Sequence, residues 1–386
     1  MYILMIMMML ILGVGLGFYG YFFVKSIFNV LKLRQDSKVI KTINIIIAII
    51  IGISCMNIFS FSTIIMLHIV GISLVVDLLC FIIKKLLKGK YNDLKIMKCF
   101  KIIVGIKIIP VIVTSVLIIY GYYNMNHIVE TDYSITTDKN ITIEEDGKYR
   151  IVLIADLHYG VSVDDEEFMR VCNEISDKKP DIVALCGDIT DENTTKEKMQ
   201  TAFNILSTID SKYGIFYVYG NHDRQLYNTH KEYTQEELSQ YIEKCGITIL
   251  KDQVYSVNEE FTIIGREDKA YGRSKKTAER KSMSTLMEGV NKDSFVLVMD
   301  HQPDEYEENE KNGTDLLISG HTHGGQIWPA NVLFKIVKFD DGVYGETVGN
   351  NGKFRAIVTS GIAGWGYPVK TASPAEYVVI DVSTKY

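Results

Sequence analysis

The chain has 386 residues, of which 47% are hydrophobic, and a formal net charge of −6. The first 123 residues carry 13 basic and 3 acidic residues, a net charge of +10, so the remaining 28 basic and 44 acidic residues give −16. Phosphate backbones need clustered Lys and Arg, so we expect no broad nucleic-acid-binding surface on the acidic part and no nucleic-acid partner. The composition shift near residue 124 indicates two chemically different parts.

The first part, residues 1–123, is dominated by apolar stretches. About 20 apolar residues cross a hydrocarbon core about 30 Å thick, so the uncharged stretch 42–76 is too long for one span. The first stretch lacks the basic leader and cleavage site of a signal peptide, so we expect it to be retained. We expect an all-α transmembrane region of about four helices, at approximately 2–24, 43–60, 63–83 and 103–123.

Two basic loops set the expected orientation of these spans. The loops contain Lys25, Lys32, Arg34, Lys38 and Lys41, and then Lys84, Lys85, Lys88, Lys90, Lys95, Lys98 and Lys101. Because basic loops stay in the cytoplasm, both should be cytoplasmic. Four spans then place everything after Tyr123 outside, whereas a single span across 42–76 would change this parity.

After an expected polar linker at 124–148, apolar runs typical of buried strands alternate with amphipathic helices. Helices are expected at 164–179, 196–209 and 235–245. Strands are expected at 149–156, 181–188, 214–220, 246–250, 253–257, 261–265, 294–300, 314–319, 354–360 and 376–382. Helices and strands alternate first and short strands follow, so we expect an α/β domain over 149–386, with two packed sheets and helices outside.

Polar side chains that can bind metals follow five of these strands. They are Asp156 and His158, Asp188, Asn221 with His222 and Asp223, His301, and His321 with His323. Each alone has a structural explanation, such as a turn or an approach to a helix. Together they indicate one shared site, because loops converge at the carboxyl edge of such sheets.

The donor types predict the metal. Imidazoles, carboxylates and one amide without a thiolate suit Mn²⁺, Fe or Zn²⁺ better than Ca²⁺, which prefers oxygen ligands only. Seven or more candidates exceed the needs of one ion, so we expect two ions and a bridging carboxylate. Asp188, alone on its loop, is the expected bridge.

The order D-x-H, G-D, G-N-H-D, H and G-H-x-H resembles the calcineurin-like metallophosphoesterase superfamily over about residues 149–386. The segments "GHTHGGQIWP" and "TIIGREDKA" are similar to the bacterial membrane-associated branch that includes the YkuE and YaeI proteins. The resemblance implies a four-layer α-β-β-α sandwich and two divalent metal ions, with Mn²⁺ expected and Fe or Zn²⁺ as alternatives. The transmembrane region lies outside it.

The resemblance also implies residue roles. Asp156, His158, Asp188 and His323 correspond to ligands of the first metal, and Asp188, Asn221, His301 and His321 to ligands of the second. His222 corresponds to the histidine that protonates the leaving group, and Asp223 to its orienting partner. Arg266 and Asp268 are further candidates for the substrate pocket, with ordinary surface pairing as the favoured alternative.

These observations predict a multi-pass cell-membrane protein with an extracytoplasmic catalytic domain. The expected activity is metal-dependent phosphoester hydrolysis, as a phosphodiesterase or phosphatase. Its location near the bilayer favours a lipid-headgroup or cell-envelope phosphoester as the substrate. The alternative is a non-catalytic phosphoesterase-fold scaffold or sensor coupled to the membrane region. This alternative is disfavoured because every position of the family motif is filled.

Overall fold

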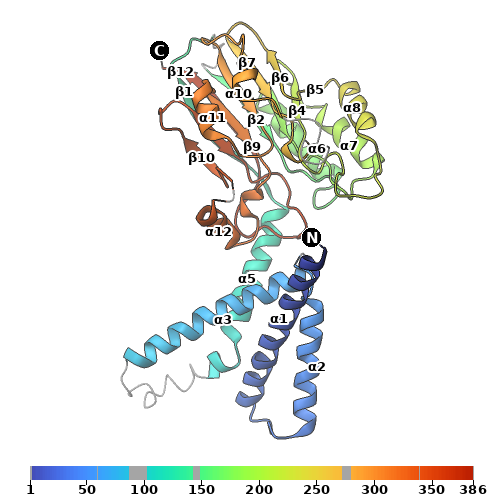
Figure 1. Ribbon diagram of the computed structural model, residues 1–386, viewed down its shortest axis with the longest axis vertical. Helices are drawn as coiled ribbons and strands as arrows, with labels where there is room; N and C mark the ends of the chain where they lie inside the picture. The colour runs from blue at the N-terminus through green and yellow to red at the C-terminus, as the bar shows by residue number, and fades with distance from the viewer. Residues whose placement is uncertain are drawn as a thin grey trace. The chain divides into compact units, whose positions relative to one another are not determined.

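The computed structural model describes residues 2–58, 60–86, 102–141, 148–271, 280–338 and 340–385. The chain divides into two compact units, Met1–Tyr120 and Gly121–Tyr386, whose elements are labelled in Figure 1. Residues 87–101, which contain most of the second lysine-rich loop, lie outside the described residues. The expected cytoplasmic position of this loop therefore stays a prediction.

The first unit is built from long apolar helices. They are α1 (Tyr2–Val30), α2 (Lys38–Ser54), α3 (Phe61–Leu86) and most of α5 (Ile108–Met125). Among the described residues, Ile6–Val30, α3 and α5 are long and apolar enough to cross a membrane. Helix α2 has 17 residues, slightly fewer than the roughly 20 that a span needs. Helix α2 ends at Ser54 and α3 begins at Phe61, near the expected division of the stretch 42–76.

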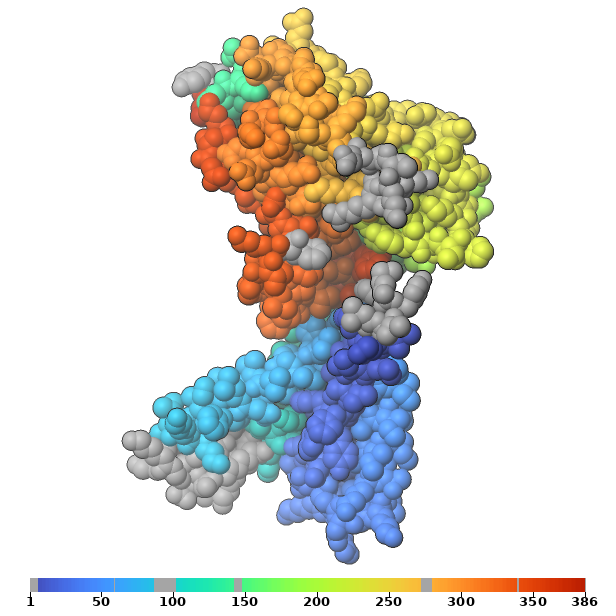
Figure 2. All heavy atoms as spheres, viewed as in Figure 1, coloured from blue at the N-terminus to red at the C-terminus, as the bar shows by residue number. Residues whose placement is uncertain are grey.

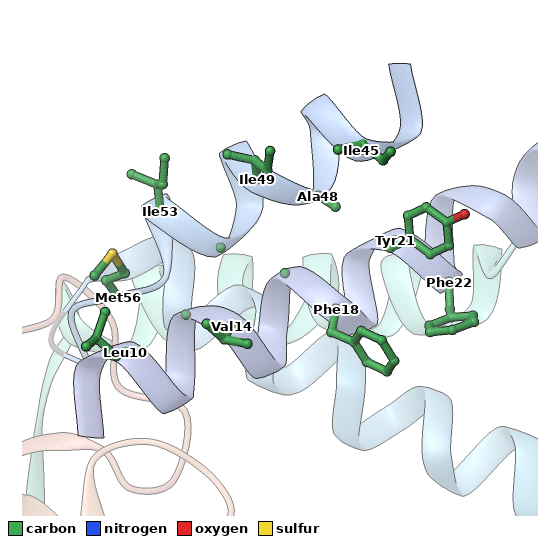
Figure 3. Close-up of a pocket in the computed structure, with 13 residues that line it drawn as sticks. Leu10, Val14, Phe18, Tyr21, Phe22, Ile45, Ala48, Ile49, Ile53 and Met56 are labelled. Carbon is green, nitrogen blue, oxygen red and sulfur yellow. The ribbon is translucent and has the colours of Figure 1, made fainter. Parts of the chain in front are cut away.

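Helices α1 and α2 pack closely through glycines. A Cβ atom on Gly17 would lie 2.9 Å from the carbonyl oxygen of Ala48, and one on Gly52 would lie 2.9 Å from that of Gly13. Small residues of this kind allow helix backbones to approach in a membrane. Figure 3 shows the apolar groove beside this contact, which is lined by residues that include Leu10, Val14, Phe18, Ile45 and Ile49.

The second unit contains two six-stranded sheets. Sheet A has the order β1 (Ile128–Thr137), β12 (Ala375–Thr384), β2 (Tyr149–Ile154), β3 (Ile182–Cys186), β4 (Ile215–Val218) and β5 (Thr248–Ile249). Strands β2 to β5 are parallel, and β12 is antiparallel to β2 and parallel to β1. Sheet B has the order β10 (Gly345–Val348), β11 (Arg355–Val358), β9 (Leu316–Ser319), β8 (Phe295–Met299), β7 (Phe261–Gly265) and β6 (Gln253–Ser256).

Three buried clusters separate the layers of this unit. Helices α6 (Asp165–Asp177), α7 (Lys196–Leu206) and α8 (Gln235–Lys244) cover the outer face of sheet A. Helix α10 (Met283–Leu286) and helix α11 (Tyr306–Asn312) cover the outer face of sheet B. The inner faces pack on each other through side chains such as Leu153, Phe216 and Leu297. The expected four-layer α-β-β-α sandwich is therefore confirmed, and Figure 2 shows its segments, green to red, as one closely packed body.

Local sequence explains where the helices begin. The side chains of Asp164, Thr195 and Thr234 each accept a hydrogen bond from the backbone of the first helical turn. Thr234 and Glu237 form a complete capping box, as the sequence predicts. These caps fix the helix starts and therefore the lengths of the loops that leave the preceding strands.

Several segments of the second unit differ from the expected secondary structure. Residues 128–137, expected as part of a linker, form β1 and pair in parallel with β12 over ten residues. The sequence "IVETDYSITT" is rich in β-branched residues but half exposed, so it lacks the apolar run of a central strand. Helix α12 (Ala330–Val337), which follows the "GHTHGG" motif, was also not expected.

Candidate metal centre

The predicted ligands come from five loops that follow β2, β3, β4, β8 and β9. Five of the seven predicted ligands have a left-handed backbone, with φ between 41° and 72°, namely Asp156, His158, Asp188, His321 and His323. A residue other than glycine in this region costs about 1–3 kcal/mol and persists only where its surroundings enforce it. Such strain concentrates at functional sites, which singles out this edge of the fold.

The first group contains Asp156, His158 and His323, whose candidate ligand atoms all lie within 4.8 Å of one another. The Nε2 atoms of His158 and His323 are 3.3 Å apart, and Nε2 of His323 lies 3.7 Å from a carboxylate oxygen of Asp156. All three side chains are buried. A carboxylate and two imidazoles that converge in this way fit a divalent transition-metal ion.

The second group contains Asp188, His301 and His321, again with ligand atoms within 4.8 Å. Nε2 of His301 lies 3.1 Å from Oδ2 of Asp188, 3.2 Å from Nδ1 of His321 and 3.2 Å from Oδ1 of Asn221. The amide oxygen of Asn221 therefore points at the same space as the second group.

Asp188 lies between the two groups. Its Oδ2 atom is 3.1 Å from His301 in the second group and 3.9 Å from Nε2 of His158 in the first. Its Oδ1 atom accepts a hydrogen bond from the backbone of His222. A carboxylate in this position is suited to bridge two cations.

Backbone carbonyls orient two of the imidazoles. Nδ1 of His301 lies 2.8 Å from the carbonyl oxygen of Cys186, and Nδ1 of His323 lies 3.2 Å from that of Ala363. These contacts place the proton on Nδ1 and leave Nε2 as the ligand atom, as is usual for metal-binding histidines. Nδ1 of His158 is buried and has no hydrogen-bond partner within the described residues.

The electrostatics of Asp156, His158 and His321 fit a cation. Burial raises the pKa of Asp156 to about 7 and lowers the pKa of His158 to about 3. Burial, and to a smaller extent the nearby His301, lowers the pKa of His321 to about 4. Neutral imidazole is the form that binds metals, and a cation beside Asp156 would restore its carboxylate form.

His222 lies beside the metal groups and has a partner that differs from the expected one. Its Nδ1 atom is 2.6 Å from Oε2 of Glu192. The carboxylate of Asp223 instead accepts hydrogen bonds from the backbone of Asp188, Thr190 and Gly220. The structure thus corrects the prediction that Asp223 orients His222. The Asp223 carboxylate instead accepts hydrogen bonds from backbone N–H groups and positions the loop of Asp188.

Charge also acts on His222. Burial alone would lower the pKa of His222, but Asp188 and Glu192 outweigh it and raise the pKa to about 9. The rings of Trp365 and Tyr227 lie 5.2 and 5.3 Å from the imidazole, measured between ring centroids. The imidazole of His222 therefore lies beside two carboxylates that favour its protonated form, with aromatic rings next to it.

The two candidate substrate residues have different environments. Arg266 is buried, and its guanidinium binds Asp252, Glu305 and the carbonyl oxygen of Lys281. Its burial among these acidic partners disfavours the expected role in binding a phosphate. Asp268 is buried too. Burial raises its pKa more than the nearby His301 lowers it, so the pKa is raised to about 6. It accepts a hydrogen bond from Gln302, next to the ligand His301.

A buried lysine supports the first group and was not predicted. Nζ of Lys370 donates to the carbonyl oxygens of Ser360, Gly361 and Ala363 at 2.5, 3.0 and 3.3 Å. The backbone N–H of Ala363 in turn donates to the carbonyl oxygen of Asp156. An isolated Lys in "GYPVKTASP" gives no sequence signal for such a role.

Comparison with known proteins agrees with this geometry. Residues 149–325 match the family described as calcineurin-like phosphoesterase. An uncharacterized metallophosphoesterase of Helicobacter pylori (strain J99 / ATCC 700824) is 26% identical over 242 residues, which are 62% of this chain and 61% of that protein. The chain thus spans about three fifths of the length of this relative.

Two relatives in Bacillus subtilis (strain 168) belong to the expected branch. The metallophosphoesterase YkoQ is 30% identical over 201 residues, 51% of this chain and 69% of YkoQ. The metallophosphoesterase YkuE is 26% identical over 214 residues, 54% of this chain and 70% of YkuE. The chain is therefore a member of the calcineurin-like metallophosphoesterase family, in the branch of the YkuE and YkoQ proteins.

Proposed function

We propose that the protein is a membrane-anchored phosphoester hydrolase with a dinuclear metal centre. The observation that carries this proposal is the position of Asp188, whose Oδ2 atom lies 3.1 Å from one ligand group and 3.9 Å from the other. A second supporting observation is the position of His222, whose backbone N–H donates to the same carboxylate and whose imidazole contacts Glu192. Together they match the two requirements of phosphoester hydrolysis, charge stabilisation and protonation of the leaving group.

The donor set indicates which residues would hold the ions. Asp156, His158 and His323 would bind the first ion, His301, His321 and Asn221 the second, and Asp188 both. Divalent ions at these positions would supply Lewis acidity toward a water molecule and toward the phosphoryl oxygens. We propose Mn²⁺ as the natural ion, with Fe or Zn²⁺ as alternatives, because the donors are nitrogen and oxygen without sulfur.

His222 would protonate the departing oxygen. Since Glu192 accepts from Nδ1, Nε2 is the nitrogen that would donate its proton when the bond between phosphorus and the leaving oxygen breaks. The water oxygen forms the new bond to phosphorus, and its proton leaves to solvent. Glu192 keeps the imidazole both oriented and protonated during this exchange.

The membrane helices favour a substrate at the bilayer surface. Three described helices are long and apolar enough to span, and α5 ends at Met125, directly before the first strand of the catalytic unit. We infer a phosphodiester of a lipid headgroup or of the cell envelope as the substrate. The lysine-rich loops support four spans and an extracytoplasmic catalytic unit, and protease digestion of intact cells tests this: a protected catalytic unit would contradict it.

Hydrolysis of a soluble diester tests the proposed activity. The full chain in detergent with Mn²⁺ should hydrolyse bis-p-nitrophenyl phosphate, and a chelator should abolish this turnover. Asp188→Asn should lose most activity and His222→Ala a large part, whereas Glu166→Gln, an exposed position on α6, should match the wild type. Turnover that is independent of metal, or full activity in both site variants, would contradict the proposal and favour a non-catalytic scaffold.

A further inference from the structure

We propose that α12 and Trp328 lie in the headgroup region of the bilayer, so that the lipid surface is the binding partner of this face of the catalytic unit. The proposal rests on the membrane anchoring in the proposed function, but it does not depend on the catalytic activity. Three observations carry it: an uncovered apolar helix face, a hydrogen-bonded connection to the end of α5, and the charge of the segment.

One face of α12 is apolar and exposed. Val332, Leu333, Ile336 and Val337 are 45%, 53%, 72% and 65% exposed, and Trp328 before the helix is 45% exposed. Positions 332, 333, 336 and 337 share one side of a helix with 3.6 residues per turn. None of the residues of α12 is buried. Four adjacent aliphatic side chains of this kind mark a contact surface, because single exposed apolar residues are ordinary but contiguous ones are not.

The loop Val369–Ser373 connects Trp328 to the end of α5. The side chain of Asn124 donates to the carbonyl oxygens of Lys370 and Ser373, and the backbone N–H of Lys370 donates to Gly121. The hydroxyl of Thr371 accepts from the backbone N–H of Trp328 at 2.9 Å. All of these residues belong to the second compact unit.

The same contacts place Trp328 level with the last turn of α5. A Cβ atom on Gly121 would lie 2.5 Å from the Cγ2 atom of Thr371, so α5 and this loop are in close contact. Trp328 is thus bound to a residue that touches the last turn of a candidate membrane span. In that turn, Tyr122 and Tyr123 are 61% and 62% exposed. Tyr and Trp are enriched where spans leave the hydrocarbon core, so these aromatic residues mark one interfacial level.

The charge of the segment suits a bilayer surface. Residues 324–338 contain Lys335 and Lys338 and no acidic residue. Both lysines are exposed, and Lys335 lies outside the apolar face of the helix. An amphipathic helix with aliphatic side chains on one face and lysines on the other lies in the membrane plane and is attracted by anionic lipids. A protein partner would not require this placement at the end of a span.

This position would bring the substrate to the metal ligands. The hydroxyl of Ser373, in the loop that contacts α5, donates to the carbonyl oxygen of the ligand His323 at 2.8 Å. Only four residues separate His323 from Trp328. A phosphodiester at the headgroup level would therefore meet the site without leaving the bilayer, which makes a membrane lipid the substrate class that this surface favours.

Tryptophan quenching tests the proposal without relying on turnover. The chain has two tryptophans, Trp328 and Trp365, so Trp365→Phe leaves Trp328 as the reporter. The full chain with this change is placed in nanodiscs of phosphatidylcholine and phosphatidylglycerol, with and without bromine near the headgroup end of the acyl chains. An interfacial ring lies about 5–10 Å into the boundary, so we expect brominated lipid to lower its emission about twofold.

Charged substitutions on the apolar face assign the quenching to α12. In the same background, the double variant Leu333→Asp and Ile336→Asp is expected to remove most of the quenching. If the double variant does not fold, Ile336→Gln alone replaces it and is expected to reduce the quenching. Val254→Asp is the matched control, since Val254 is 44% exposed on β6, at the opposite edge of sheet B from β10, and it should leave the quenching unchanged.

Three results would overturn the proposal. Emission from Trp328 that brominated lipid leaves unchanged would place it in water or under protein. Quenching that survives both α12 variants would assign it to the nearby end of α5 instead. Emission that changes with the number of protein copies per nanodisc, but not with bromine, would identify a second copy as the partner. Metal-dependent hydrolysis of the soluble diester would stand in each case, so the two proposals fail separately.

Discussion

Nδ1 of His222 lies 2.6 Å from Oε2 of Glu192, and this contact defines which nitrogen of His222 faces the metal groups. A general acid matters most when the leaving group is a poor one. We predict that His222→Ala lowers kcat about 10²–10⁴-fold for an alkyl phosphodiester and much less for the p-nitrophenyl diester. Equal losses for both substrates would contradict the assigned role.

Glu192 is expected to act through His222. Glu192→Gln keeps the size of the side chain but removes its charge, so we predict a loss of about tenfold for the poor leaving group. The loss for the p-nitrophenyl diester should be smaller, and Asp223→Asn should instead weaken metal binding, because Asp223 holds the backbone of Asp188. A uniform effect of Glu192→Gln on both substrates would indicate a merely structural role.

Lys370 is expected to position the first metal group. Lys370→Met leaves the carbonyl oxygens of Ser360, Gly361 and Ala363 without their donor, which costs about 1–3 kcal/mol of unfolding free energy. Affinity for Mn²⁺ should fall about tenfold, as measured by competition with a chelating dye. Lys353→Met is the control, because the Lys353 side chain is 71% exposed. Unchanged affinity in Lys370→Met would exclude the supporting role.

Metal ions should stabilise the fold. Without a cation, the site buries Asp156 and Asp188 together and keeps five ligands in a strained backbone conformation. Saturating Mn²⁺ at about 100 times its Kd should raise the unfolding free energy by about 2.7 kcal/mol. Thermal unfolding with Mn²⁺ and with a chelator measures this difference, and an equal shift in Asp188→Asn would show that the ions bind elsewhere.

Asp381 gives a prediction for pH. On β12 it lies opposite Arg150 of β2 and accepts hydrogen bonds from Arg150 and Lys148. Burial alone would raise the pKa of Asp381, but these hydrogen bonds outweigh it and lower the pKa. A lowered pKa in the folded state means that the contribution to stability is present above the unfolded pKa, near 3.9, and is lost as the pH falls through the folded value.

We therefore expect Asp381→Asn to lower the unfolding free energy by about 1 kcal/mol at pH 7. At acid pH, below the folded pKa of Asp381, the variant and the wild type should converge, because the carboxyl group is then protonated in both states. Urea unfolding at the two pH values measures this, with the exposed Asp210→Asn as the control. A difference that persists at low pH would assign the effect to packing.

The grouping of the candidate ligands could be predicted from the sequence because the signal is local. Each ligand directly follows a buried strand, such as Asp188 after "DIVALC" and His301 after "FVLVMD", and the carboxyl edge of a sheet brings such positions together. The apolar runs predicted ten of the twelve strands for the same reason. The two missed strands, β1 and β10, lie at sheet edges, where half-exposed residues weaken the pattern.

Contacts between distant residues could not be predicted in this way. Asp223 adjoins His222 in the sequence, yet the histidine binds Glu192, which lies 30 positions earlier. Arg266 lies in a motif of the family branch, but its burial among Asp252 and Glu305 depends on packing that periodicity does not describe. The exposure of α12 likewise follows from what the fold leaves uncovered.

The central claim, a metal pair bridged by Asp188, is tested most directly by electron paramagnetic resonance of the full chain loaded with Mn²⁺. We expect two ions per chain and the spectrum of an exchange-coupled pair, because two ions that share a carboxylate lie about 3.5–4 Å apart. Asp188→Asn should remove the coupling, and Glu166→Gln should retain it. The six-line spectrum of isolated Mn²⁺ in the saturated wild-type protein would contradict the claim.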